Sequence, residues 1–274
     1  VILVADKKLT LGKNSVIRGT GGNEELDTLV LGTDATAGRG DGTLVRVSGN
    51  SNASIIRSGV SSSTTPDLVV GAGVKLSGGG IMLDSTAGTR LNTSALLQGE
   101  SVLLRSGQIS IRLNKPGKLN PTSGLVLSGG ALEGLQESAR SLSLLSYSSL
   151  DVYGSGTVGS RAFESLALQA ASIRGFNTGG GTASFVAKNL ILEDVAGSPA
   201  SSQLPGGLAG TIRFDADQVT LGANDTRVDG FANTEISADN RILVTGDGSF
   251  HSRGALELIS PLFTGGSASS YKIS

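Results

Sequence analysis

Carboxylates with a spacing suited to acid–base chemistry gather in the last third of the sequence. Asp215 and Asp217 alternate with apolar residues in "RFDADQV", so both side chains point to the same side of an extended strand. Enzymes that cleave polysaccharides use such a pair as acid and base. Solvated carboxylates also simply keep a strand soluble, and no basic cluster or aromatic sugar platform accompanies these. Three further aspartates extend the candidate acidic face: Asp225, Asp229 and Asp239.

A second candidate is the tripeptide Arg39-Gly40-Asp41, flanked by Gly38 and Gly42. In an exposed loop, Arg-Gly-Asp is associated with integrin-binding adhesion, where the aspartate completes a metal site on the receptor. A glycine-rich polar sequence also produces this tripeptide by chance, and Asp-Gly is a normal tight-turn sequence. An adhesion loop and a plain turn therefore remain alternatives. A calcium-binding nonapeptide repeat is rejected because its nine-residue spacing does not recur.

The composition excludes several classes of chemistry. The chain has no cysteine and one histidine, His251, which removes disulfides, thiol catalysis and the common zinc ligand sets. A formal charge of −1 gives no reason to expect nucleic acid or an anionic membrane as a partner. No apolar run is long enough for a transmembrane helix. We therefore predict no cofactor, no metal and no enzymatic activity.

Short strands recur along the chain at intervals of about 24 residues. Each unit begins with an apolar-x-apolar triplet and continues through a Gly, Ser or Asn turn into a second short strand. Helical patterns are nearly absent, and the best of them, at 131–145, is interrupted by Gly134. The units begin at Val74, Val102, Leu125, Leu142, Leu166, Leu190, Val219 and Ile242.

Alternation within the units indicates which side chains face the core. We expect Val74, Leu76, Ile81 and Leu83 to point inward, with Lys75 and Ser77 outward. Likewise Ile109, Ile111 and Leu113 should point inward, with Gln108, Ser110 and Arg112 outward. In the last third, Ile212 and Phe214 should face in, with Arg213 and Asp215 facing out.

A unit of about 24 residues has the size of one coil of a parallel β-helix, in which equivalent strands of successive coils pair in register. The sequence predicts an all-β, parallel β-helix of about eleven coils, as a single segment over 1–274. A β-sandwich also has short strands and glycine-rich turns, but it lacks the recurring unit and usually has a more aromatic core.

Three segments, "DGTLVRVSGNSNASIIRSGV", "PDLVVGAGVKLSGGGIMLDSTAG" and "GESVLLRSGQISIRL", carry a family resemblance. They resemble the repeat regions of filamentous-haemagglutinin-type exoproteins of Gram-negative bacteria, and the similarity of pattern covers most of the chain. The resemblance implies a right-handed β-helical rod, exported unfolded through an outer-membrane secretion partner (two-partner secretion). It also implies roles in adhesion, biofilm formation, toxin delivery or virulence.

From these observations we expect a structural shaft with an adhesive surface, secreted or on the bacterial outer cell surface, that continues into further coils of a longer chain. The expected partners are a host or neighbouring cell surface, glycans or matrix. Hydroxyl-rich turns at 48–54 and 61–65 suit weak contacts with glycans. The alternative function is a polysaccharide lyase or hydrolase that uses the acidic face.

Overall fold

The computed structural model describes residues 1–21, 28–32, 39–51, 54–61, 64–113, 121, 124–176, 179–197, 205–266 and 269–274. The chain is all-β, and the described residues contain one helix. It divides into two compact units: Val1–Gln108 with Ser123–Arg140, and Ile109–Thr122 with Ser141–Ser274. The prediction of one continuous segment stays a prediction. Parts of both hydroxyl-rich turns, residues 52–53 and 62–63, lie outside the described residues.

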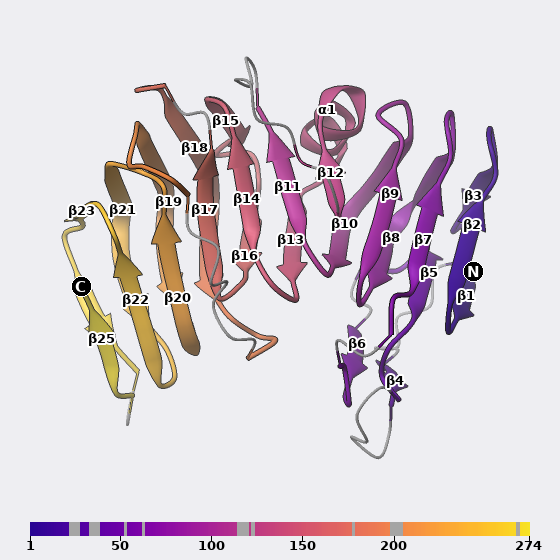
Figure 1. The fold of residues 1–274 in the computed structure, drawn as a ribbon, viewed down its shortest axis with the longest axis horizontal. Coiled ribbons are helices and arrows are strands. Elements are labelled where there is room, and N and C mark those ends of the chain that lie inside the picture. Colours follow the sequence, from indigo (N-terminus) through magenta and orange to yellow (C-terminus); the bar gives the residue numbers. More distant parts are fainter. Residues whose placement is uncertain are drawn as a thin grey trace. The chain divides into compact units, whose positions relative to one another are not determined.

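The second unit consists of two sheets in which every described strand pair is parallel. The first sheet contains β13 (Ser141–Ser146), β15 (Gly156–Gly159), β16 (Ser165–Gln169), β18 (Thr182–Glu193), β19 (Thr211–Leu221), β21 (Asn233–Val244), β23 (Ala255–Ile259) and β24 (Phe263–Gly265). The second sheet contains β11 (Ile109–Arg112), β14 (Leu150–Tyr153), β17 (Ser172–Phe176), β20 (Asn224–Asp229), β22 (Gly248–Ser252) and β25 (Tyr271–Ile273). Figure 1 shows these strands side by side. This parallel pairing differs from the antiparallel sheets of a β-sandwich.

In-register pairing places aliphatic side chains above one another in columns. One column runs through Leu142, Leu166, Leu190, Val219 and Ile242, each at most 1% exposed. Successive members are separated by about 23 to 29 residues, which is the recurrence that the sequence displays. Side chains that stack in this way bury apolar surface from both neighbours, so each strand depends on the next for its core.

The predicted alternation is confirmed at nearly every position. The inward residues of the three segments, from Val74 to Phe214, are all buried, whereas Lys75 is exposed and Arg213 and Asp215 are half-buried. Ser110 is the exception, because it is fully buried although it was expected to face solvent. It lies in register with Asp151, which is also buried, so this part of the outer face of the second sheet is covered.

Aromatic residues fill the space that small residues leave inside the second unit. Phe231 is 1% exposed, and a Cβ atom added to Gly175 would lie 2.7 Å from its ring. Gly230, just before it, has φ of 83°, a backbone conformation that favours glycine. Phe185 and Phe214 are in register and stack with their ring centroids 5.9 Å apart.

Apart from β12, the described strands of the first unit pair in three groups. One contains β1 (Ile2–Ala5), β3 (Val16–Arg18), β5 (Thr43–Ser48), β8 (Lys75–Ser85) and β10 (Leu96–Ser106), and another contains β2 (Lys8–Leu11), β7 (Asp67–Val70) and β9 (Gly88–Leu91). The third consists of β4 (Thr28–Leu31) and β6 (Ser54–Arg57), and β12 (Leu125–Leu127) and α1 (Gly129–Ser138) complete the unit (Figure 1).

The regular repeat is interrupted in the first unit. β2 pairs with β7, about 59 residues later, whereas β7 pairs with β9 after about 21. The additional chain contains β4, β5 and β6, and β5 runs antiparallel to both β1 and β8. The sequence did not predict this reversal. β5 brings Leu44, Val45 and Val47 into the core, all with no exposed surface, so apolar burial stabilises the strand in either direction.

The helix α1 replaces a strand that the repeat predicted after Leu125. Its buried residues are Ala131, Leu132 and Leu135, a helical spacing that forms one apolar face against β10. The Ser138 hydroxyl donates a hydrogen bond to the Leu97 carbonyl at 3.2 Å, and the Arg140 backbone amide donates one to the Glu100 backbone carbonyl at 2.8 Å. These tertiary contacts hold a helix that spans Gly134.

Phe231→Ala should remove a large part of the packing inside the second unit. We expect the free energy of unfolding to fall by about 3–5 kcal/mol, because the cavity beside Gly175 cannot close. The matched control is Phe263→Ala, since the Phe263 side chain is 52% exposed, and it should change stability by less than about 1 kcal/mol. Urea unfolding followed by far-UV circular dichroism measures both, and equal losses would contradict this packing.

Candidate functional site

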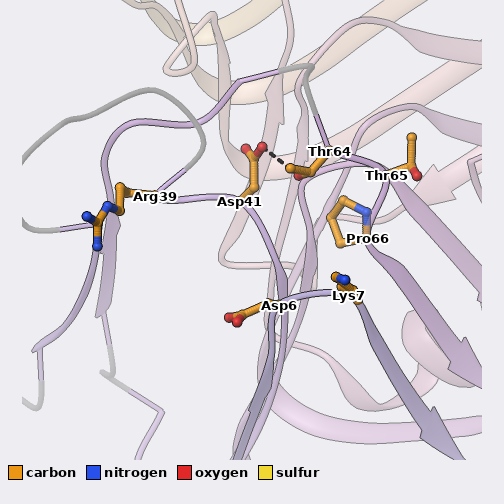
Figure 2. A pocket seen from close by; sticks show the side chains of 7 residues that line it. All are labelled: Asp6, Lys7, Arg39, Asp41, Thr64, Thr65 and Pro66. Carbon is orange, nitrogen blue, oxygen red and sulfur yellow. Dashed lines mark hydrogen bonds between the residues drawn. The ribbon is translucent and has the colours of Figure 1, made fainter.

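The Arg-Gly-Asp tripeptide lies immediately before β5, and its aspartate is bonded within the chain. The Asp41 carboxylate accepts hydrogen bonds from the Ser61 amide at 2.7 Å and the Ser61 hydroxyl at 3.0 Å. It also accepts one from the Thr64 hydroxyl at 2.6 Å, which Figure 2 shows. These three donors fix the carboxylate in place. This geometry favours a structural role, because an integrin ligand needs its carboxylate available to a metal ion on the receptor.

The backbone around Asp41 is equally constrained. The Gly40 amide donates to the Gly59 carbonyl, and a Cβ atom at Gly40 would lie 1.9 Å from the Ser58 carbonyl oxygen. The Arg57 guanidinium donates to the Gly40 carbonyl and also pairs with the buried Asp84 carboxylate at 3.1 Å. Only glycine permits so close a backbone approach. Packing alone therefore explains why position 40 is a glycine, without any role in adhesion.

A cavity of about 560 Å³ opens beside this loop. Its lining comes from three segments: the β1–β2 connection, the residues that precede β5, and the residues that precede β7 (Figure 2). The lining residues are Asp6, Lys7, Arg39, Asp41, Thr64, Thr65 and Pro66. Sequence analysis singled out Arg39 and Asp41 but not the other five, because the additional chain between β3 and β7 separates them by tens of residues.

The fold explains why these segments meet. β1 stops pairing with β5 at Ala5 and Thr43, and β2 begins to pair with β7 at Lys8 and Asp67. Asp6 and Lys7 therefore lie at a fork, where the chain leaves one strand partner and takes another. A cavity at such a fork is a direct consequence of the additional chain.

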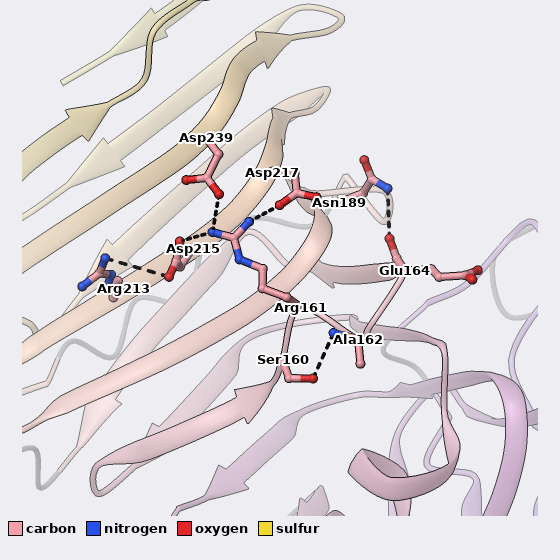
Figure 3. Close-up of polar contacts among 9 residues, drawn as sticks. All are labelled: Ser160, Arg161, Ala162, Glu164, Asn189, Arg213, Asp215, Asp217 and Asp239. Atoms are coloured by element: carbon pink, nitrogen blue, oxygen red, sulfur yellow. Dashed lines mark hydrogen bonds and ion pairs between the residues drawn. The ribbon is translucent and has the colours of Figure 1, made fainter.

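The candidate acidic face is partly brought together around an arginine (Figure 3). Arg161, in the connection between β15 and β16, pairs with Asp215 at 2.8 Å, with Asp239 at 3.1 Å and with Asp217. Arg213 adds a longer contact of 3.9 Å to Asp215. Asp217 and Asp239 lie where the register between β19 and β21 shifts, and this irregularity turns both carboxylates toward the same guanidinium.

Arg161 was not predicted from the sequence, because it lies more than fifty positions before Asp215 in the chain. The pairing register was the signal available, because Ser165, Asn189 and Gln218 occupy one column. Arg161 lies four residues before Ser165, in the connection that leads into β16, and Asp215 lies three residues before Gln218 on β19. A turn in which the Ala162 amide donates to the Ser160 hydroxyl at 3.1 Å positions the arginine (Figure 3).

The other two aspartates of the predicted face lie elsewhere, on β20. The Asp225 carboxylate accepts a hydrogen bond from the Ser249 hydroxyl at 2.7 Å. Asp229 is 1% exposed and pairs with Arg227 at 2.6 Å. The ring of His251 is exposed, and its Nδ1 lies 3.0 Å from the Ser274 hydroxyl. The five aspartates therefore do not form one site.

Asp229 belongs to a buried polar ladder that sequence analysis missed. Asp151, Arg174 and Asp229 are in register on β14, β17 and β20. The Arg174 guanidinium donates two hydrogen bonds of 2.7 Å to the Asp151 carboxylate and lies over the Phe176 ring. Removing one partner of such a pair leaves an uncompensated buried charge, which typically costs about 3–5 kcal/mol. The ladder is therefore structural.

Two tyrosines lie close to carboxylates. Burial, together with the nearby charges of Asp225 and Glu193, raises the pKa of the Tyr271 hydroxyl to about 12. Burial also raises the pKa of Tyr153, with Asp151 contributing in the same direction. Both phenols are therefore protonated at neutral pH and make poor bases.

No family model matches the chain, and no curated protein or solved structure matches it either. Among the described residues, no group of three or more His, Cys, Asp or Glu side chains is arranged to hold a metal ion. No helix in this part of the chain has the length and apolar character needed to cross a membrane.

Asp41→Glu tests the structural role of the tripeptide. The longer side chain cannot keep all three hydrogen bonds, so we expect a loss of about 1–3 kcal/mol in the free energy of unfolding. The control is Asp6→Glu, since Asp6 is exposed and makes no ion pair with any described residue. Urea unfolding measures both. Cell attachment to the coated protein that a soluble Arg-Gly-Asp peptide blocks would instead indicate an adhesion loop.

Proposed function

We propose that this chain is a segment of a structural shaft with an adhesive lateral surface, in a secreted or cell-surface exoprotein of the filamentous haemagglutinin type. In this proposal the parallel sheets close into a right-handed β-helix of about eleven coils. The shaft projects a distal module from the bacterium, and its side contacts a host or neighbouring cell, glycans or matrix. The observation that carries the proposal is the set of in-register apolar columns, exemplified by Leu142, Leu166 and Leu190.

The end of the second unit supports the view that further coils follow. Leu258 lies in register with Ile236, and Phe263 with Ile242. Ile236 and Ile242 have no exposed surface, whereas Leu258 and Phe263 are 38% and 52% exposed. These two residues continue the apolar columns, and among the described residues no strand pairs with β23 or β24 on the side away from β21. Another coil would bury them and would pair the outer edges of β23 and β24.

Export through an outer-membrane secretion partner belongs to the same proposal. Its support is the family resemblance, together with a cysteine-free chain that forms no disulfide before export. A solenoid suits delivery in this form, because each coil needs only its neighbour to fold and the chain adds coils as it emerges.

Polysaccharide cleavage is a second candidate, and it is favoured by the convergence of Asp215, Asp217 and Asp239. Cleavage needs one protonated and one ionised carboxylate on either side of a glycosidic bond. Here all three carboxylates contact Arg161, an arrangement that fastens the turn between β15 and β16 rather than leaving two carboxylates free to flank a sugar. The shaft is therefore preferred.

The closed solenoid predicts one fixed distance between its two ends. The chain lacks cysteine, so spin labels attach only at introduced sites such as Thr10→Cys on β2 and Lys272→Cys on β25, both exposed. About eleven coils at about 4.8 Å each predict a narrow distance distribution on the order of 50 Å. Double electron–electron resonance measures it, and a broad distribution would contradict a rigid shaft.

The enzymatic candidate has a separate test. We expect the protein to release no new reducing ends or unsaturated products from polygalacturonate, alginate or hyaluronan. Release that disappears in Asp215→Asn and persists in Asp225→Asn would instead establish the acidic face as a catalytic site, because Asp225 lies outside the Arg161 cluster.

A further inference from the structure

We propose that the cavity at the fork between β1 and β2 is a binding site for a carboxylated sugar, namely a hexuronate unit. The inference goes beyond the shaft, because every lining residue belongs to the first unit. The proposed binding site does not depend on whether the sheets close into a solenoid. Its volume of about 560 Å³ lies within the range of about 300–1,000 Å³ typical of small-molecule sites.

The charges of the lining select the ligand. Lys7 supplies a cation, which suits a carboxylate. Arg39 lies on the other side of the lining in Figure 2 and already makes an interaction within the chain, so the carboxylate of the ligand is assigned to Lys7. The Asp41 carboxylate is already engaged by the donors on Ser61 and Thr64. Lys7 makes no ion pair with any residue that the structure describes, so its ammonium group is available to a ligand.

Asp6 gives the site a second requirement. Its exposed carboxylate also makes no ion pair within the described part of the chain, and Figure 2 shows it pointing to the side on which Arg39 lies. A carboxylate accepts hydrogen bonds from hydroxyl groups and repels a second negative charge. A ligand with one carboxylate and several hydroxyls therefore fits better than a phosphate or a polysulfate.

The remaining lining completes the match to a pyranose. The hydroxyls of Thr64 and Thr65 border the cavity, and both residues are exposed. Pro66 is buried and presents an apolar ring, which suits the C–H face of a sugar. Ligand sites typically combine such apolar surface with a few polar groups that fix orientation.

The walls are held together from behind, which reduces the ordering that binding requires. The Thr43 hydroxyl donates to the Ala5 carbonyl at 3.0 Å, and the Asp67 amide donates to the Lys7 carbonyl at 2.9 Å. On the third wall, the Pro66 carbonyl accepts hydrogen bonds from the Ser85 hydroxyl and the Gly88 amide. A cavity whose backbone is fixed in this way is preorganised for a ligand.

Isothermal titration of the whole chain with sodium D-glucuronate and sodium D-galacturonate tests the proposal. We expect at least one uronate to bind about tenfold or more tightly than D-glucose and than sodium acetate, because the site needs both the carboxylate and the hydroxyls. Failure of both uronates to bind would overturn the proposal. Equal binding of glucose, or of acetate, would also overturn it.

A set of lysine variants locates the binding. Lys7→Gln should weaken uronate binding about tenfold or more, and Lys7→Arg should retain most of it. Lys13→Gln is the matched control, because Lys13 is equally exposed and lies outside the lining. Its affinity should equal that of the unmodified chain. The same loss in Lys13→Gln and Lys7→Gln would show attraction by net charge alone and would refute the assignment.

Discussion

The stacking of like apolar side chains along parallel strands is the constraint on which the rest of this structure depends. A strand of four or five residues cannot bury a face by itself, so its stability comes from the strands on either side. Leu166 is buried because Leu142 and Leu190 lie on either side of it, and Phe214 because Phe185 lies beside it. The scarcity of aromatic residues and the abundance of glycine follow from the same constraint, since thin layers need small, regular side chains and many turns.

Departures from the repeat are the places where cavities and charge clusters arise. In the first unit, the additional chain around β5 separates strands that would otherwise be consecutive, and a polar cavity lies where it rejoins. In the second unit, the register shift between β19 and β21 gathers carboxylates around Arg161. The regular columns supply length and stability, whereas these irregularities supply the groups that could bind.

Much of the core was predictable from the sequence, because alternation depends only on strand geometry. The inward residues from Val74 to Leu83 and at Ile212 and Phe214 illustrate this. The direction of β5 was not predictable, since an alternating strand reads the same in both directions. Ser110 and Asp151 are buried because other parts of the fold cover them, which no local pattern reports. The helix at Gly129–Ser138 forms through contacts with β10 that the interrupted pattern around Gly134 could not reveal. The tripeptide at Arg39–Asp41 was visible, but the Ser61 and Thr64 donors that fix Asp41 were not.

Methyl–methyl nuclear Overhauser effects in a protein labelled at leucine, isoleucine and valine methyl groups test the stacking most directly. In-register parallel strands predict contacts from Leu142 to Leu166 and from Leu166 to Leu190, continuing to Val219 and Ile242. The absence of these contacts, or their replacement by a set that fits antiparallel neighbours, would contradict the columns and the shaft proposed from them.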